Sequence, residues 1–135
     1  MIVNLISLIL IFIENSISVN SILVGISLPY LSFILGKKKN LLLILLVYVF
    51  MSLQSDRYFF NFFMLALFCG VNFFIFRFIE YSRKISLYLP IMDIIFYFLY
   101  SYRNFEIEYL LVNIIFFIIF NYIYTARSRE IKGNK

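Results

Sequence analysis

The sequence has no histidine, no tryptophan, one cysteine, two prolines and four glycines among its 135 residues. Without histidine, neither a histidine-based catalytic triad nor a histidine-ligated zinc site can form. Cys69 lies inside an apolar run and has no second cysteine with which to form a disulfide or a metal site. The serines have no histidine to activate them, and no glycine-rich phosphate loop is present. The sequence therefore indicates neither an enzyme nor a cofactor-binding protein.

Charge is also scarce. Charged residues make up 14% of the chain and hydrophobic residues 64%, whereas a soluble domain is about a quarter charged and half apolar. A water-soluble fold of this length has too little interior to hide so much apolar surface. We therefore interpret residues 1–135 as a single all-α integral membrane domain. The first run has no basic start and no small-residue cleavage site, so we expect a retained span and not a signal peptide.

Apolar runs separated by charges predict about six transmembrane helices in one bundle. The runs are 2–13, 17–35, 41–53, 58–79, 85–100 and 109–124. Only the second and the fourth reach the length of about 20 residues that a full span needs, so the others must borrow flanking residues, sit short or re-enter. The runs are apolar on every face, which is typical of helices and not of the strands of a membrane barrel. A four- or five-span version, with residues 1–35 arranged differently, is an alternative.

The basic residues sort to one side of a six-span chain. If the N-terminus is cytoplasmic, the cytoplasmic segments hold Lys37, Lys38, Lys39, Arg77, Arg83, Lys84, Arg127, Arg129, Lys132 and Lys135. The opposite side holds only Arg57 and Arg103, together with the acids Glu14, Asp56, Glu106 and Glu108. Because cytoplasmic loops carry the excess of Lys and Arg, we expect a multi-pass protein with both termini in the cytoplasm. The basic tail 125–135 is expected to be frayed and to contact anionic lipid heads, with no nucleic acid as partner.

Asp93 is an acidic residue at depth in a predicted span. It lies eight residues into the run 85–100, about 12 Å from the cytoplasmic end of that helix. A carboxylate there is costly and should face protein and find a partner. Asn72, on the preceding span, lies at a matching depth of about 10 Å, and Arg77 is one turn nearer the cytoplasm, where snorkelling outward is its cheaper option. We favour a neutral Asp93 that bonds Asn72 and joins the fourth and fifth spans; the alternative is a proton or ligand site.

Asp56 and Arg57 interrupt the apolar pattern between the third and fourth spans. A hairpin there re-exposes backbone to water. We expect Asp56 to accept from the free N–H groups at the start of the next helix, whose positive end its charge also suits. This assigns the two residues a structural role.

Residues 41–84 resemble the central part of the rod shape-determining protein MreD family. That family typically has an apolar span ending in a Gly-Leu-x-x-Asp-like segment, then a turn, a span with a small residue and a basic cytoplasmic stretch. Here "SLQSD" (52–56) stands in that place, with Ser52 instead of glycine, and Gly70 is the small residue. "SLPYLSFIL", with Pro29, and the closing "LLVNIIFFIIFNYIYTARSREIK" are similar to the family's early and last spans.

The resemblance implies a non-enzymatic subunit of the cell-elongation machinery in the bacterial cytoplasmic (inner) membrane. Such a subunit would bind an MreC-like membrane protein and, through it or directly, MreB-like filaments and peptidoglycan synthases. The family is also thought to share its six-helix architecture with the substrate-binding subunits of energy-coupling-factor vitamin transporters. A small-molecule capture subunit is therefore the alternative function, and a small holin-like membrane protein is a third.

Overall fold

The computed structural model describes residues 1–17, 23–37, 40–53 and 55–133, and these residues form helices and turns without strands. The α-helices are α1 (Ile2–Ile17), α2 (Ser27–Lys37), α3 (Leu41–Ser52), α4 (Tyr58–Phe78), α5 (Leu89–Tyr100) and α6 (Ile107–Gly133). A short 3₁₀ helix, η2 (Arg83–Leu87), precedes α5. The predicted all-α class is confirmed for the described residues.

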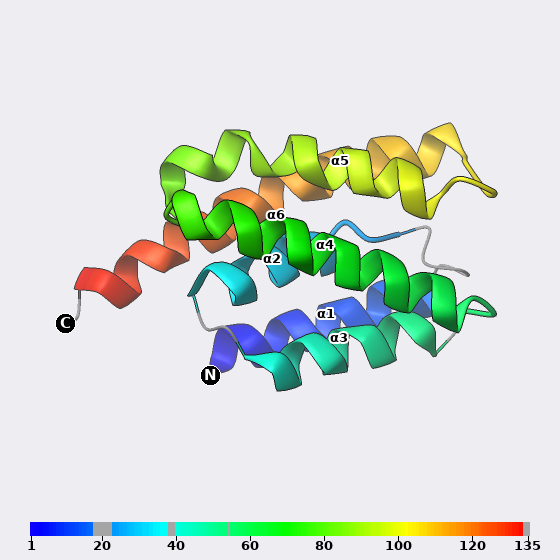
Figure 1. The fold of residues 1–135 in the computed structure, drawn as a ribbon, viewed down its shortest axis with the longest axis horizontal. Coiled ribbons are helices and arrows are strands. Elements are labelled where there is room, and N and C mark those ends of the chain that lie inside the picture. The colour runs from blue at the N-terminus through cyan, green and yellow to red at the C-terminus, as the bar shows by residue number, and fades with distance from the viewer. Residues whose placement is uncertain (18–22, 38–39, 54, 134–135) are drawn as a thin grey trace.

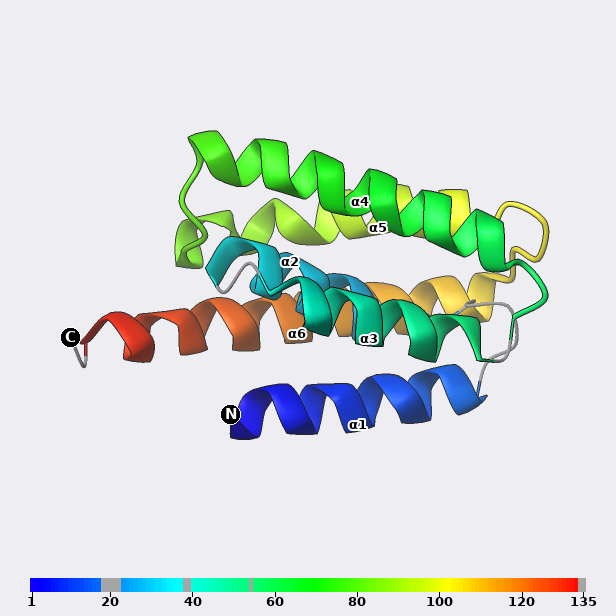
Figure 2. The same ribbon diagram turned by 60° about the horizontal axis from the view of Figure 1, so that its bottom comes forward.

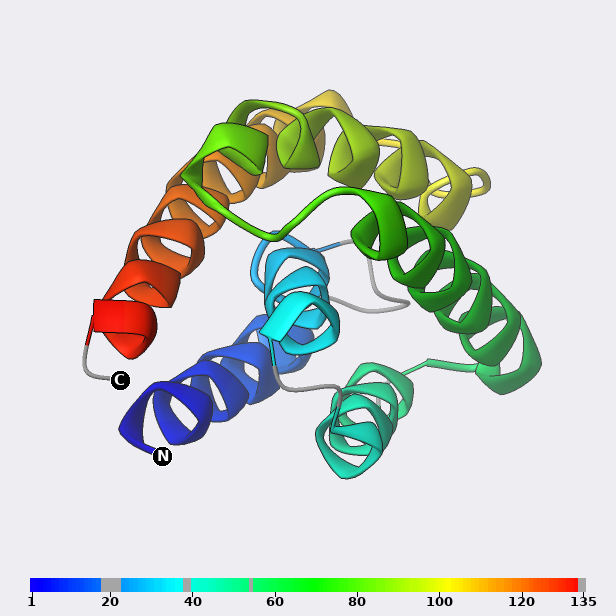
Figure 3. The ribbon, with the colours of Figure 1, turned by 60° about the vertical axis from the view of Figure 1, so that its left-hand side comes forward.

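Successive helices run in opposite directions, so their termini gather at two opposite ends of a bundle (Figures 1 and 2). In an oblique view with the left-hand side of Figure 1 turned forward, α2 is the central helix, and α1, α3, α4, α5 and α6 surround it (Figure 3). α2 packs against α3, α4, α5 and α6, while α1 packs against α3. A hydrogen bond of 2.7 Å between the hydroxyls of Ser7 and Tyr124 also joins α1 to α6. The fold is therefore a ring of five helices around a sixth.

The two ends of the bundle differ in charge. One end, which we call the basic end, contains the last residues of α2 and α4 together with η2, and it carries Lys37, Arg77, Arg83 and Lys84. The C-terminal turns of α6 project beyond this end, where the N-terminus also lies (Figure 1). The opposite end, which we call the loop end, contains residues 55–57 and 101–106, with Arg57 and Arg103 as its basic residues.

The central position of α2 requires two close approaches. Every residue from Ser27 to Leu35 is buried. Gly25 and Gly36 flank this segment: a Cβ atom added at Gly25 would lie 2.5 Å from Cβ of Phe116, and one at Gly36 would lie 2.5 Å from Cβ of Tyr81. Only the absence of a side chain lets neighbouring segments come so near at both ends of α2.

The predicted span 17–35 is not one helix. α1 continues to Ile17, and the chain is non-helical at 23–26 before α2 begins at Ser27. The Val24 N–H donates to Oδ1 of Asn113 on α6 at 3.0 Å, so a side chain 89 residues away serves backbone that a continuous helix would bond internally. A hydrogen-bond partner so distant in sequence leaves no periodic pattern in the run 17–35. The pattern of that run therefore predicts a single span.

Two other boundaries differ from the prediction. The run 85–100 divides into η2 and α5, because Pro90 lacks an N–H and suits the first turn of a helix better than its interior. The tail 125–135 is not frayed from its start, since α6 continues to Gly133. α3 and α4 agree with the predicted runs 41–53 and 58–79 to within one residue at each end.

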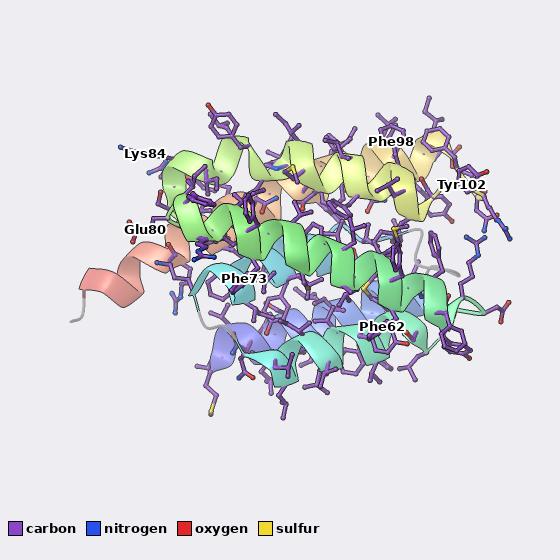
Figure 4. All side chains as sticks on the ribbon, viewed as in Figure 1. Phe62, Phe73, Glu80, Lys84, Phe98 and Tyr102 are labelled. Atoms are coloured by element: carbon purple, nitrogen blue, oxygen red, sulfur yellow. The ribbon has the colours of Figure 1, made fainter. Side chains whose placement is uncertain are left out.

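The outer surface of the ring is apolar. Exposed large hydrophobic side chains occur on all five outer helices, among them Ile2, Leu5 and Ile9, Leu42 and Leu45, Phe59, Phe63 and Phe74, Ile91 and Ile95, and Leu111, Ile115 and Ile118. Side chains project outward all along the bundle, including the labelled Phe62, Phe73 and Phe98 (Figure 4). Within the described residues, α4 and the segment Ile107–Ser128 of α6 are each long and apolar enough to cross a membrane.

Candidate functional site

Polar side chains inside the bundle meet at the start of α2. Glu14, in the last turn of α1, is 4% exposed. Its Oε1 accepts from the Ile26 N–H at 2.8 Å, and its Oε2 accepts from the N–H and the hydroxyl of Ser27 at 3.1 and 2.7 Å. The side-chain oxygens of Glu14 thus satisfy backbone donors at the beginning of α2.

This arrangement corrects one sequence-based expectation. Glu14 was expected among the external loop charges, because it follows the apolar run 2–13. The helix instead continues past it, and the buried face of α1 includes Ser7, Ile11 and Glu14 at spacings of four and three residues. Glu14 is therefore a structural acid between α1 and α2.

Asp93 and Asn72 are both fully buried, but they do not bond each other. Oδ2 of Asp93 accepts from Nδ2 of Asn121 on α6 at 2.6 Å. Asn72 instead donates to the Phe68 carbonyl at 3.0 Å and accepts from the Ser32 hydroxyl of α2 at 3.4 Å. The predicted pair is therefore wrong: Asp93 joins α5 to α6, and Asn72 joins α4 to α2. The position of each residue along its helix predicts that both are buried. It does not predict the direction in which each side chain points around its helix.

Some polar atoms near Asp93 have no partner among the described residues. They are Oδ1 of Asp93, Oδ1 of Asn121 and the hydroxyl of Tyr81. Burial, and to a smaller degree the nearby Asp93 and Tyr124, raises the pKa of the Tyr81 hydroxyl above its ordinary value. Tyr81 thus remains a neutral donor close to an aspartate that has one oxygen without a bond.

The other predicted residues lie near the bundle ends. Arg77 is exposed in the last turn of α4, which agrees with the expectation that its side chain snorkels outward. Asp56 is exposed, and the N-cap residue of α4 is Arg57, which has no side-chain capping bond. The N-cap position of α4 is therefore held by Arg57, one residue after Asp56. The Arg57 N–H donates to the Ser55 hydroxyl at 3.1 Å.

Arg57 and Arg103 come together at the loop end. They line one groove of about 500 Å³, formed by the first turn of α4 and the α5–α6 connection; its lining residues are Asp56, Arg57, Tyr58, Phe59, Phe60, Tyr102 and Arg103. The Arg57 guanidinium lies over the Phe60 ring, 5.9 Å from its centroid. The sequence pattern predicts a turn at Arg57 and indicates no role for Arg103. Their shared position on the less basic side was the only signal that linked them.

A larger groove of about 830 Å³ lies at the basic end, between the last turns of α4 and the η2–α5 segment. It is lined by Ile75, Phe78, Ile79, Glu80, Ser82, Lys84, Ile85, Tyr88, Leu89, Ile91 and Met92. Glu80 and Lys84 are seen at this end of the bundle in Figure 4, and Tyr102 at the other. The walls are mainly apolar, so this groove presents hydrocarbon with charge only at its rim.

The described residues contain no group of three or more His, Cys, Asp or Glu side chains close enough to hold a metal ion. Their buried polar side chains join pairs of helices: Glu14 joins α1 to α2, Asn72 joins α4 to α2, and Asp93 joins α5 to α6. The chemistry that this arrangement supports is helix association. Comparison of the chain with protein-family models, curated proteins and solved structures gave no match.

Proposed function

We propose that the protein is a multi-pass integral membrane scaffold whose bundle lies in the bilayer with its basic end toward the cytoplasm. The apolar outer face of all five ring helices supports this, because soluble monomers rarely expose such continuous apolar surface. The separation of charge supports the orientation: Lys37, Arg77, Arg83 and Lys84 gather at one end and Arg57 and Arg103 at the other. Both termini are then cytoplasmic.

The observation that carries the proposal is that the backbone of the non-helical segment 23–26 is buried and hydrogen-bonded by side chains of other segments. Irregular backbone at membrane depth is tolerated only where it is buried in protein, because lipid offers no hydrogen bonds. Here the N–H groups of Val24, Ile26 and Ser27 are bonded by side chains of Asn113 and Glu14, and the segment lies inside the ring. In the described part of this connection, residues 23–26, these backbone donors therefore face protein and not lipid.

Some outer helices are shorter than the hydrocarbon core of a bilayer, whereas a neighbouring helix is long enough to cross it. α3 has 12 residues and is about 18 Å long, whereas the hydrocarbon core is about 30 Å thick. α4 has 21 residues and is about 32 Å long, so it covers that thickness alone. A six-span bundle combines such full-length helices with shorter ones whose ends are completed by polar turns and local thinning of the bilayer.

The role of the scaffold is to bind another membrane protein. The centre of the bundle is occupied by α2, so the large free surfaces are lateral. On the exposed face of α4, Ala66 and Gly70 are one turn apart, and a Cβ added at Gly70 would meet nothing within 4 Å. Small residues at this spacing let a second transmembrane helix approach closely. Gly70 is also the small residue of the MreD-like pattern, which supports a single-span, MreC-like partner at this face.

In this proposal the protein is a non-enzymatic subunit of the cell-elongation machinery in the bacterial cytoplasmic membrane. Through its partner it helps to organise MreB-like filaments and peptidoglycan synthases. The alternative is a capture subunit of a vitamin-type transporter. The loop-end groove of about 500 Å³ favours that alternative, because its volume falls within the range of about 300 to 1,000 Å³ that is usual for small-molecule sites.

The test is recovery of partners from the native membrane. The detergent-solubilised protein should co-purify with an MreC-like chain, and its depletion should round the cells. Gly70→Ile should reduce that recovery, while Ile118→Phe, an enlargement at an exposed position on α6, should not. Recovery of transporter ATPases and a bound vitamin, without a cell-shape partner, would establish the alternative instead.

A further inference from the structure

The loop end holds an unusual combination of charge and apolar surface. Among the described residues its basic side chains are Arg57 and Arg103, and both line the same groove. The Arg57 guanidinium contacts the Phe60 ring, and neither arginine forms an ion pair among the described residues. Two guanidiniums therefore remain free to bind an anion in one groove.

The backbone at this groove adds to the positive potential. The groove is built on the first turn of α4, a helix of 21 residues whose N-cap residue has no side-chain capping bond. The N-terminus of a long helix carries partial positive charge and N–H groups that favour anions. Asp56 is the opposing charge in the lining. Two guanidiniums and a helix N-terminus against one carboxylate leave the groove with an excess of positive charge.

The remaining walls of the groove are aromatic, and they are open to the outside. Tyr58, Phe59, Phe60 and Tyr102 complete the lining, and Phe59 is 91% exposed. Aromatic residues at helix ends are typical of the level of lipid headgroups. A lipid at that level presents both a polar headgroup and hydrocarbon to the protein. A small soluble anion would use the arginines and leave the aromatic walls in water.

We propose that the loop-end groove binds the phosphate group of an anionic phospholipid from the leaflet opposite the cytoplasm. Arg57 and Arg103 bind the phosphate oxygens through charge-assisted hydrogen bonds, and the acyl chain follows the apolar side of α4 past Phe59. Asp56 opposes the phosphate and moderates the affinity. This inference rests on the membrane embedding proposed above, and it adds a lipid site on the side that carries few basic residues.

A single tryptophan can report on this site, because the chain contains none. Phe59→Trp places the fluorophore in the groove, and Phe78→Trp places one in the groove at the other end of the same helix. Each protein is reconstituted into vesicles of phosphatidylcholine. Part of the lipid is then replaced by chain-brominated phosphatidylcholine or chain-brominated phosphatidylglycerol, which quench tryptophan on contact. The ratio of the two quenching curves gives the relative association constant at each position.

We expect brominated phosphatidylglycerol to quench the tryptophan at position 59 more strongly than brominated phosphatidylcholine. Arg57→Gln and Arg103→Gln, each added to Phe59→Trp, should lower the relative association constant about fivefold, and together about 25-fold, as expected for basic residues near a membrane surface. Asp56→Asn should raise it. Arg77→Gln, at the opposite end of α4, should leave the value at position 59 unchanged.

Three results would overturn the inference. Equal quenching by the two lipids at position 59 would remove the anion preference. An equal effect of Arg77→Gln would assign the preference to overall charge. Loss of the preference on addition of inorganic phosphate at constant ionic strength would assign the groove to a soluble anion. If instead neither position were quenched by brominated phosphatidylcholine, the membrane embedding itself would be wrong, which separates that failure from failure of the lipid site.

Discussion

Glu14 and Ser27 lie on different helices, yet their side chains are joined by a hydrogen bond of 2.7 Å from the Ser27 hydroxyl to Oε2 of Glu14. The same carboxylate also accepts from the N–H groups of Ile26 and Ser27. One side chain from the outer ring thereby holds the start of the central helix. The position of α2 depends on this contact at one end and on the close approach of Gly36 to Tyr81 at the other.

Replacement of Glu14 should therefore destabilise the fold. Glu14→Ala leaves three buried donors without this acceptor, and we expect a loss of about 2 kcal/mol or more in the free energy of unfolding. Glu14→Gln keeps one acceptor oxygen and should cost less. Glu106→Gln, in the exposed turn before α6, is the matched control and should have no effect. Thermal unfolding in detergent measures the difference, and an unchanged melting temperature for Glu14→Ala would refute the capping role.

The sequence predicted the helices that are bounded by charges. α3 and α4 lie between Lys39 on one side and Glu80 on the other, with Asp56 and Arg57 at their turn, so their limits follow from the positions of the charges. It did not predict that α2 lies in the centre. That result depends on which face of each neighbour turns inward, and the continuously apolar runs contain little information about direction.

Some of the buried polar contacts could be predicted from the sequence and others could not. A signal for the buried face of α6 was present: Asn113, Phe117, Asn121 and Thr125 recur every four residues, and all four are fully buried. Reading that spacing would have placed Asn121 inward as a candidate partner for Asp93. The contact between Glu14 and Ser27 had no such signal, because an acid at the end of an apolar run has the same pattern whether it faces water or a helix terminus.

Asp93 should act mainly through its bond to Asn121. Asp93→Asn keeps a polar group of the same shape and should be well tolerated, whereas Asp93→Leu leaves the amide of Asn121 without its partner and should cost about 1 kcal/mol. Adding Asn121→Leu to Asp93→Leu should cost less than the sum of the single changes, and a second change at Asn72 should show no such coupling. Membrane level, thermal unfolding and cell shape are the measurements. Loss of function in Asp93→Asn at normal protein level would instead indicate a charge-dependent site.

Gly25, Gly36 and Gly70 should divide into two classes. Gly25→Ala and Gly36→Ala each force a methyl group against a neighbour at 2.5 Å, so we expect losses of about 1–3 kcal/mol. Gly70→Ala meets no atom within 4 Å, and alanine favours a helix over glycine by about 1 kcal/mol, so this change should be neutral or stabilising. Thermal unfolding of the three purified variants tests the division. Equal effects at the three positions would contradict the close packing of α2.

The last prediction concerns the orientation of the bundle. Lys84, in η2, and Asn104, between α5 and α6, are both exposed and lie at opposite ends. On a Cys69→Ala background, Asn104→Cys should react with a membrane-impermeant maleimide in intact cells, and Lys84→Cys should react only after the cells are opened. The expectation follows from the gathering of basic residues at the end that contains Lys84, because such residues are retained on the cytoplasmic side. Labelling of Lys84→Cys in intact cells, with Asn104→Cys protected, would show the inverted orientation. Labelling of both in intact cells would show that the bundle does not separate the two sides, and the six-span arrangement would then be wrong.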